Sequence, residues 1–336
     1  MVRRTLDDSG PFFECRLRIM RLMSAPQRAL IGLDGRTAGS QHQSICWPLQ
    51  AADISAREDA IKLARHAAVN EVSGLLSPAE PGPFERLDIE PAQPTLLVCD
   101  HASNRIPRAL NDLGLDAADR ETHIALDIGA GAVTRQLSQR LGLPAVLAGY
   151  SRLVVDCNRR LDDPTAFPES VDGVEIPANI GLADAERQRR ADALYWPYHH
   201  AIRDRLADLE RIRPAPAVVA IHSFTPELGD ERRPWHFAIL WDKDPRISER
   251  LLEQLRAVSG VHVGDNQPYS GRHPSDFTID HHAEAEGLPH VGIELRQDLL
   301  RSPEGVERWS NILAACLAPI LREAALYTNW SGHRVT

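Results

Sequence analysis

The sequence predicts an α/β fold in which helices cover both faces of a mixed, mostly parallel sheet. Two observations support this prediction. From residue 94 to about residue 325, short apolar runs rich in branched side chains alternate with longer amphipathic stretches. The short runs are bounded by turn-forming or polar residues, as is typical of buried strands, whereas the longer stretches carry apolar residues at helical spacing.

Seven of the short apolar runs are predicted strands, and four of the amphipathic stretches are predicted helices. The first helix stops at Gly142, a residue type common just beyond a helix end. The predicted strands are residues 95–100, 145–148, 153–156, 217–221, 237–241, 261–263 and 290–295. The predicted helices are residues 131–141, 183–213 with a break at Pro197, 246–258 and 304–326.

The chain divides into three parts by sequence character. Residues 1–50 lack clear periodicity and are expected to be a poorly ordered N-terminal extension. Residues 51–93 contain a helical patch at 56–76 and then a proline-rich stretch that predicts a linker. Residues 94–330 are therefore expected to form the functional domain.

Composition excludes several classes of protein. The 336 residues carry 38 Lys and Arg against 47 Asp and Glu, and the net charge of −9 argues against a general nucleic-acid binder. No stretch of about 18 uncharged apolar residues occurs, so no transmembrane helix is expected. The five cysteines are scattered without a CxxC pair, which argues against a disulfide scaffold or a four-cysteine zinc site. The scattered cysteines and the lack of the apolar segment of a signal peptide together predict a cytoplasmic protein.

Reactive polar side chains follow the carboxyl ends of several predicted strands. Ligands in α/β sheets bind outside these ends, so the residues there are candidates for a site. Eleven of the 14 histidines also lie between His101 and His290. The strand-end candidates are Asp100, His101, Asn104, Asp156, Asn158, Arg159, His222, Ser223, Glu294 and Arg296.

If these strand ends converge, their side chains match a hydrolytic zinc site. Two imidazoles and one carboxylate or amide oxygen would hold the ion, a free carboxylate would take a proton from water, and arginines would hold an anionic substrate. Spacing alone leaves structural roles open. His101 could cap a turn, Ser223 could cap a helix, and Glu294 could simply pair with Arg296. No dinucleotide-binding, P-loop, nucleophile-elbow or HExxH pattern offers another chemistry.

Six segments, in this order, closely resemble the N-formylglutamate amidohydrolase family over roughly residues 94–325. They are LVCDHASNRIP at 97–107, HIALDIGA at 123–130, SRLVVDCNR at 151–159, HSF at 222–224, DNQPYSG at 265–271 and ELR at 294–296. The family hydrolyses N-formyl-L-glutamate to formate and L-glutamate, a late step of histidine breakdown. The resemblance implies a three-layer α/β/α domain of the zinc-carboxypeptidase-like (phosphorylase/hydrolase-like) class, similar also to succinylglutamate desuccinylases.

The resemblance also implies a set of metal ligands. His101 and His222 match the two imidazole ligands of a zinc ion, although other divalent metals also suit such ligands. In the carboxypeptidase-like pattern a glutamate follows the first histidine, and Asn104 occupies that position here. We therefore expect Asp127 to be the third ligand, with Asn104 as the alternative. Glu294 matches the carboxylate that activates water.

The substrate implied by the resemblance is a small anionic N-acyl amino acid. Asn158 and Arg159 match a pair that holds its carboxylate, and Tyr269 matches a tyrosine near the substrate. Arg152 and Arg296 are candidates for a second carboxylate.

Asp100 replaces a proline that usually precedes the first histidine in enzymes with this activity. This departure predicts a related branch of the family: hydrolysis of N-formyl-L-glutamate is the expected reaction, and the acyl group is the part of the substrate that can differ. The alternatives left open are a deacylase of another N-acyl amino acid, a peptidoglycan-type amidase and a non-catalytic binding relative.

Overall fold

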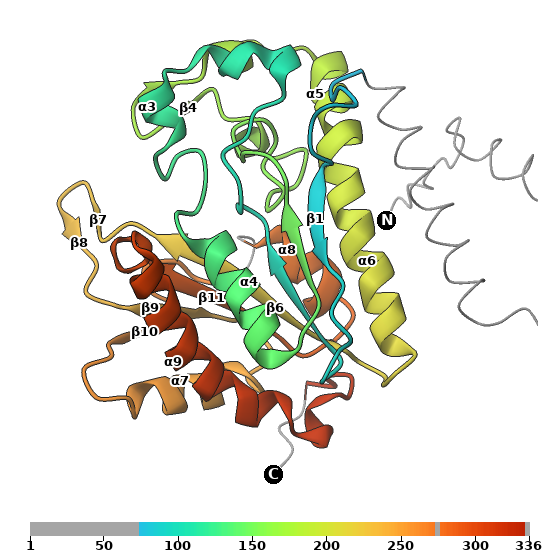
Figure 1. Ribbon diagram of the computed structural model, residues 1–336, viewed down its shortest axis with the longest axis vertical. Coiled ribbons are helices and arrows are strands. Elements are labelled where there is room, and N and C mark those ends of the chain that lie inside the picture. The colour runs from blue at the N-terminus through green and yellow to red at the C-terminus, as the bar shows by residue number, and fades with distance from the viewer. Residues whose placement is uncertain (1–73, 273–275, 333–336) are drawn as a thin grey trace, which may run out of the picture. The chain divides into compact units, whose positions relative to one another are not determined.

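A computed structural model of the chain describes residues 74–272 and 276–332. Seven strands of this part form one sheet, in the order β1-β3-β2-β6-β11-β9-β10 (Figure 1). Four neighbouring pairs are parallel, whereas β1 with β3 and β9 with β11 are antiparallel. The strands are β1 (Phe84–Leu87), β2 (Thr95–Cys99), β3 (Ala145–Ala148), β6 (Ala217–Phe224), β9 (Phe237–Leu240), β10 (Val263–Asp265) and β11 (His290–Arg296). The predicted mixed, mostly parallel sheet is confirmed.

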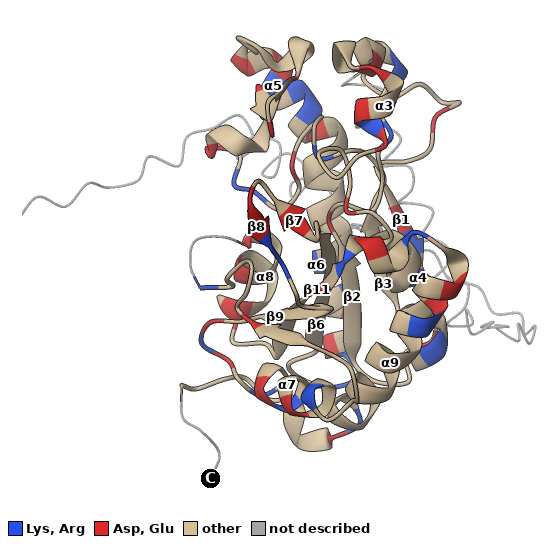
Figure 2. Ribbon diagram, turned by 90° about the vertical axis from the view of Figure 1, so that its left-hand side faces the viewer, with Lys and Arg blue, Asp and Glu red and all other residues tan. Residues whose placement is uncertain are grey.

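The central strands are buried on both faces, which explains their continuous apolar sequences. Every residue of β2 and β6 is buried, and successive side chains point to opposite faces. One face packs against α6 (Trp196–Glu210) through a core that includes Val218. The other face packs against α4 (Ala130–Leu141), α7 (Ser248–Arg256) and α9 (Pro303–Leu321) through a core that includes Val219. Figure 2 shows α4 and α9 together on one side of the strands.

The predicted strand at residues 153–156 is wrong, because this segment forms a buried turn. Leu153 and Val154 still pack into the core, so the apolar run indicates that the segment is buried and not that it forms a strand. Side chains instead of a neighbouring strand satisfy part of the backbone: Asn179 Nδ2 donates to the carbonyl of Leu153 at 2.9 Å, and Arg190 donates to that of Val154 at 3.3 Å.

The predicted break at Pro197 is also wrong. α5 (Asp184–Arg190) continues through a π-helical stretch, Ala191–Tyr195, directly into α6. Proline occupies the first turn of α6, where its missing N–H is tolerated. The longer π-helical turn thus allows a continuous helical segment across a residue that usually ends one.

Smaller elements complete the described part. β10 begins at Val263, later than the predicted strand at 261–263, and α9 ends at Leu321 before a short 3₁₀ turn, Ala324–Leu326. β1 lies before residue 94, where we expected the organised part to begin. The remaining short elements are α3 (Ala117–Arg120), α8 (Phe277–Ile279) and the two-stranded hairpins β4 (Ser170–Val171) with β5 (Val174–Glu175) and β7 (Glu227–Leu228) with β8 (Glu231–Arg232).

Two sequence predictions fall outside the described residues, namely the N-terminal extension at 1–50 and all but the end of the helical patch at 56–76. Within the part that is described, none of the helices combines the length and the hydropathy needed to cross a membrane.

Candidate active site

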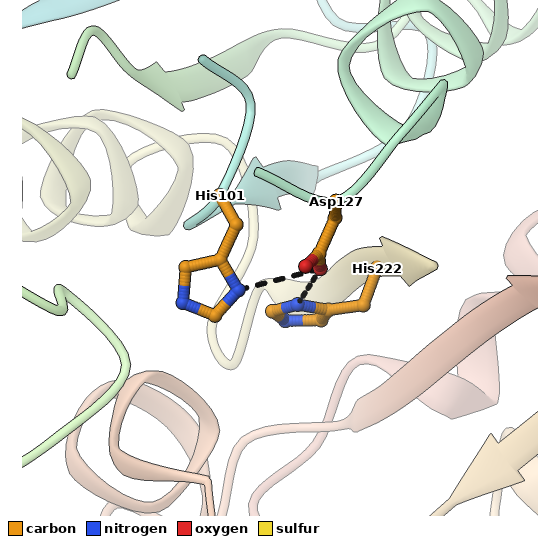
Figure 3. A group of neighbouring side chains, drawn as sticks. All are labelled: His101, Asp127 and His222. Carbon is orange, nitrogen blue, oxygen red and sulfur yellow. Dashed lines mark hydrogen bonds and ion pairs between the residues drawn. The ribbon is translucent and has the colours of Figure 1, made fainter. Parts of the chain in front are cut away.

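Two imidazoles and a carboxylate meet at the carboxyl end of the parallel strands (Figure 3). His101 follows β2, Asp127 precedes α4, and His222 lies within β6; all three side chains are buried. Oδ2 of Asp127 lies 3.3 Å from Nδ1 of His101 and 2.9 Å from Nδ1 of His222. One ligand atom from each residue lies within 4.8 Å of the other two. This donor set is the kind that holds zinc in proteins.

The sheet and one loop bring these residues together. β2 and β6 are parallel neighbours, so His101 and His222 reach the same edge of the sheet. The backbone N–H of Asp127 donates to the carbonyl of His101 at 3.0 Å, and its Oδ2 also accepts from the backbone N–H of Ser223 at 3.3 Å. Gly129 permits the turn that follows: its φ is +82°, and a Cβ there would collide with Leu300.

Two further carboxylates contact the imidazoles from the side remote from Asp127. Nε2 of His101 donates to Asp156 Oδ1 at 2.7 Å, and Nε2 of His222 lies 3.3 Å from Asp100 Oδ2. Each imidazole therefore directs Nδ1 toward Asp127 and Nε2 toward another carboxylate. Histidines that bind metals usually contact a carboxylate through their other nitrogen in this way, which fixes the tautomer and the ring orientation.

Arg152 is held by the acidic residues of this cluster. Its guanidinium donates to Asp156 Oδ2 at 3.1 and 2.8 Å, and to Asp127 Oδ1 at 3.5 Å. Burial would raise the pKa of Asp156, but the charge of Arg152 and that of His101 hold this pKa well below its ordinary value. Arg152 thus orients and neutralises Asp156 and Asp127. It also lines the cavity described below, so its contact with a second substrate carboxylate stays a prediction.

Negative charge surrounds the imidazoles. Burial would lower the pKa of His222, but Asp100 and Asp127 raise this pKa well above its ordinary value. Burial likewise would lower the pKa of His101, which Asp156 and Asp127 raise. Three carboxylates thus face two imidazoles, and the Arg152 guanidinium pairs with two of them, Asp127 and Asp156. Such a pocket favours a cation at the point where the Nδ1 atoms converge, and its residues fit a divalent metal.

Glu294 lies beside His222 because β11 runs parallel to β6 and pairs these two residues in register. The side chain is 8% exposed, and its Oε2 has no hydrogen-bond partner in the described part of the chain. Burial raises the pKa of Glu294 to about 7, with Asp127 and Asp276 adding to the rise and the two histidines opposing it. A carboxyl group with a pKa near neutrality can both accept and donate a proton.

A cavity of about 470 Å³ opens over this cluster. The residues predicted as metal ligands, catalytic groups and substrate contacts line it, with the exception of Arg296 and of the alternative ligand Asn104. Arg296 instead pairs with Asp298 Oδ1 at 2.8 Å and donates to the carbonyls of Arg233 and Pro234. Asn104 is also directed elsewhere, since its Nδ2 donates to the Arg120 carbonyl at 3.0 Å and to Glu121. The structure thus brings Asp127, and not Asn104, to the histidines.

The rest of the lining includes polar side chains and the aromatic ring of Tyr269. Asn158 is buried and accepts from the backbone N–H of Thr278 at 2.9 Å, and Arg159 donates to the Asn158 carbonyl. Tyr269 is 43% exposed, and its hydroxyl accepts from Arg233 at 3.1 Å. The guanidinium of Arg233 also lies 5.0 Å from the Tyr269 ring centre.

Three ionisable residues of the lining were not predicted from the sequence: His123, Arg272 and Asp276. His123 belongs to one of the motifs that carry the family resemblance, so a signal for it was present. Arg272 and Asp276 follow the end of β10 by several residues, and no spacing or strand-end position distinguishes them.

The sequence model of the N-formylglutamate amidohydrolase family matches residues 93–301. The chain belongs to this family. The resemblance recognised in the sequence motifs is therefore confirmed. N-formylglutamate deformylase of Pseudomonas putida is 26% identical over 226 residues, which is 61% of this chain and 80% of that protein. N-formylglutamate deformylase of Pseudomonas aeruginosa is 26% identical over 201 residues, 55% of this chain and 75% of that protein.

Two solved structures resemble this member of the N-formylglutamate amidohydrolase family. A protein of Agrobacterium tumefaciens is 34% identical with a TM-score of 0.71, and the match covers 74% of this chain and 98% of that one. N-formylglutamate amidohydrolase of Ralstonia eutropha is 21% identical with a TM-score of 0.59, and covers 72% and 97%. The second likeness supports the fold.

Proposed function

We propose that this protein is a metal-dependent amidohydrolase that converts N-formyl-L-glutamate and water to formate and L-glutamate. One observation carries the proposal: in a member of this family, the cluster of His101, Asp127 and His222 lies beside the buried Glu294 in a single cavity. The substrate comes from the family and from the curated relatives, which are N-formylglutamate deformylases.

His101, Asp127 and His222 would hold the metal. Two imidazoles and a carboxylate suit zinc well, and the same ligands also accept other divalent ions. When bound, the ion would polarise the formyl carbonyl and lower the pKa of a water molecule toward about 7. The carboxylates behind the histidines support this assignment, because they leave the Nδ1 atoms directed toward one point.

Glu294 would move the proton. Its carboxylate accepts a proton from the attacking water, whose oxygen forms a bond to the formyl carbon. The same carboxyl group then gives that proton to the amide nitrogen as the C–N bond breaks, so formate and the free amine leave. The burial of Glu294 and its pKa of about 7 support this exchange in both directions.

Asn158 and Arg159 would bind the amino-acid carboxylate, which positions the amide bond over Glu294. Tyr269, which lines the same cavity, would also contact the substrate. Arg272 replaces Arg296 as the candidate partner of the second carboxylate, because Arg272 lines the cavity and Arg296 does not.

The position of Asp100 supports formyl as the acyl group. This residue lies behind His222 and is not among those that line the cavity. We therefore keep the formyl group of the relatives as the proposed acyl group.

The proposal is tested by formate release from N-formyl-L-glutamate after reconstitution with zinc. N-acetyl-L-glutamate, N-succinyl-L-glutamate and N-formyl-L-leucine serve as comparison substrates. We expect N-formyl-L-glutamate to have the highest kcat/KM. A preference for another acyl group would replace the proposed substrate, and zinc binding without turnover of any compound would indicate a binding protein.

A further inference from the structure

Asp100 is a buried carboxylate that neither holds the proposed metal nor moves a proton in the mechanism above. It directly follows β2 and is 1% exposed. Its Oδ1 accepts from the Tyr198 hydroxyl at 2.9 Å and from the Thr278 hydroxyl at 2.6 Å. Burying a carboxylate is costly unless donors surround it, so this arrangement indicates a role for the charge.

The other oxygen of Asp100 faces a proposed metal ligand. Oδ2 lies 3.3 Å from Nε2 of His222, and neither buried atom makes a hydrogen bond with another described group. An ionised carboxylate can only accept, so the imidazole nitrogen that faces it carries the proton. Nδ1 of His222 then remains as the nitrogen directed toward Asp127, where the metal would bind.

We propose that Asp100 is a positioning residue that fixes the tautomer and orientation of His222, with Tyr198 and Thr278 holding Asp100 in place. We call these three residues the Asp100 cluster. The inference rests on the metal site proposed above, and it extends that proposal to residues outside the cavity lining. With the proton on Nε2 directed toward Asp100, Nδ1 of His222 would offer its lone pair to the metal.

The carboxylates that contact the two imidazoles are held by different kinds of donors. Asp156, behind His101, is held by the guanidinium of Arg152 and by the backbone N–H of Asn158 at 2.8 Å. Asp100 is held by two neutral hydroxyls, and His222 is the ionisable group paired with it. The loss of a single hydroxyl next to Asp100 should therefore be enough to disturb His222 and lower zinc affinity.

Thr278 also connects the Asp100 cluster to the substrate side of the cavity. Its hydroxyl donates to Asp100, and its backbone N–H donates to Oδ1 of Asn158 at 2.9 Å. A change that moves the start of α8 would thus disturb both His222 and Asn158. Removing the hydroxyl alone leaves the backbone contact, which separates the two effects.

The test is zinc affinity of the full chain, measured by competition with a chromogenic chelator. Asp100→Asn keeps the shape of the side chain and removes its charge, and we expect zinc affinity to fall about 10- to 100-fold. Thr278→Val and Tyr198→Phe remove one donor each and should give smaller losses of zinc affinity. Thr278→Ser keeps the hydroxyl and should bind zinc with wild-type affinity. Nitrogen-15 chemical shifts of His222 in the zinc-bound protein should show a protonated Nε2 in the wild type and its perturbation in Asp100→Asn.

Thr95→Val is the matched control. Thr95 is as buried as Thr278, and it lies at the end of β2 remote from Asp100. Its hydroxyl pairs with that of Tyr327 at 3.0 Å. We expect this variant to bind zinc like the wild type.

Wild-type zinc affinity in both Asp100→Asn and Thr278→Val would overturn the inference. If Asp100→Asn does not fold, wild-type affinity in both Thr278→Val and Tyr198→Phe would overturn it. A wild-type chain that binds zinc but releases no formate would contradict the proposed function. The zinc affinities of the variants would still decide whether Asp100 positions His222. A wild-type chain that binds no zinc would contradict both.

Discussion

Glu294 is the residue on which the proposed chemistry depends most directly. A carboxylate that exchanges a proton with water and with the leaving amine cannot be replaced by an amide. We expect Glu294→Gln, which keeps the size of the side chain, to bind zinc at the wild-type level and to lose at least about 100-fold in kcat. Elemental analysis and formate release measure the two effects. Turnover at the wild-type rate would remove Glu294 from the mechanism.

The pKa of Glu294 also predicts a pH-dependent stability. Burial raises this pKa from 4.5 to about 7, so the folded metal-free protein holds the proton more tightly than the unfolded chain does. The stabilisation is fully present below about pH 4.5 and is lost as the pH rises through about 7. Relative to the metal-free wild type, metal-free Glu294→Gln should therefore gain melting temperature between about pH 5 and pH 8. A difference that is the same at both pH values would contradict the raised pKa.

Asp127 and Asn104 are distinguished by their positions. Oδ2 of Asp127 lies between the two imidazoles, whereas Asn104 donates to the Arg120 carbonyl. We expect Asp127→Asn, His101→Ala and His222→Ala each to lose zinc. Asn104→Ala should keep a full equivalent per chain, as elemental analysis would show. Zinc loss in Asn104→Ala with retention in Asp127→Asn would reverse the assignment.

The sequence predicted the cavity position of the metal-ligand and proton-transfer candidates better than that of the arginines. His101, His222 and Glu294 are recognisable because each lies at the carboxyl end of a strand and within a family motif. Arg296 shares both features, yet its partners, Asp298 and two carbonyls of a distant loop, decide its direction. Arg272 has neither feature. Side-chain direction depends on loops that no local pattern reveals.

At the scale of elements, hydrophobicity predicted burial more reliably than conformation. The apolar run at 153–156 is buried, but side chains of Asn179 and Arg190 rather than a strand neighbour satisfy its carbonyls. The helical segment at 183–213 continues past Pro197 because a π-helical stretch precedes it. The first error arises from backbone partners that distant residues supply, and the second from a change of helix type that hydrophobic spacing does not reveal.

The turn that carries Asp127 into α4 depends on Gly129. Its φ of +82° disfavours any side chain, and a Cβ there would also collide with Leu300. Gly173 has the same φ in the β4–β5 turn, with no atom near enough to meet a Cβ. We expect Gly173→Ala to cost about 1–3 kcal/mol of unfolding free energy, and Gly129→Ala to cost more and to weaken zinc binding. Urea titrations and zinc competition measure these effects; equal costs and equal zinc affinity would show that the turn does not position Asp127.

At the scale of the whole molecule, the site follows from strand order. β2, β6 and β11 are consecutive parallel neighbours, so residues from three distant segments reach one edge of the sheet. Alternating apolar and amphipathic segments predicted the α/β class and the use of strand ends. They could not predict which strands are adjacent, because that depends on pairing between distant segments. The net charge of −9 is compatible with an anionic substrate because Arg159 and Arg272 line the cavity locally.

Zinc should stabilise the whole domain, because its proposed ligands come together only in the folded chain. A ligand that binds only the folded state at 100 times its Kd adds about 2.7 kcal/mol to the unfolding free energy. For a domain of this size we expect zinc to raise the melting temperature by about 5–10 °C and a chelator to reverse the rise. Asn104→Ala should show the same shift, and Asp127→Asn should show almost none. An equal shift in Asp127→Asn would mean that zinc stabilises the fold from a different site, since the proposed one lacks its carboxylate in that variant.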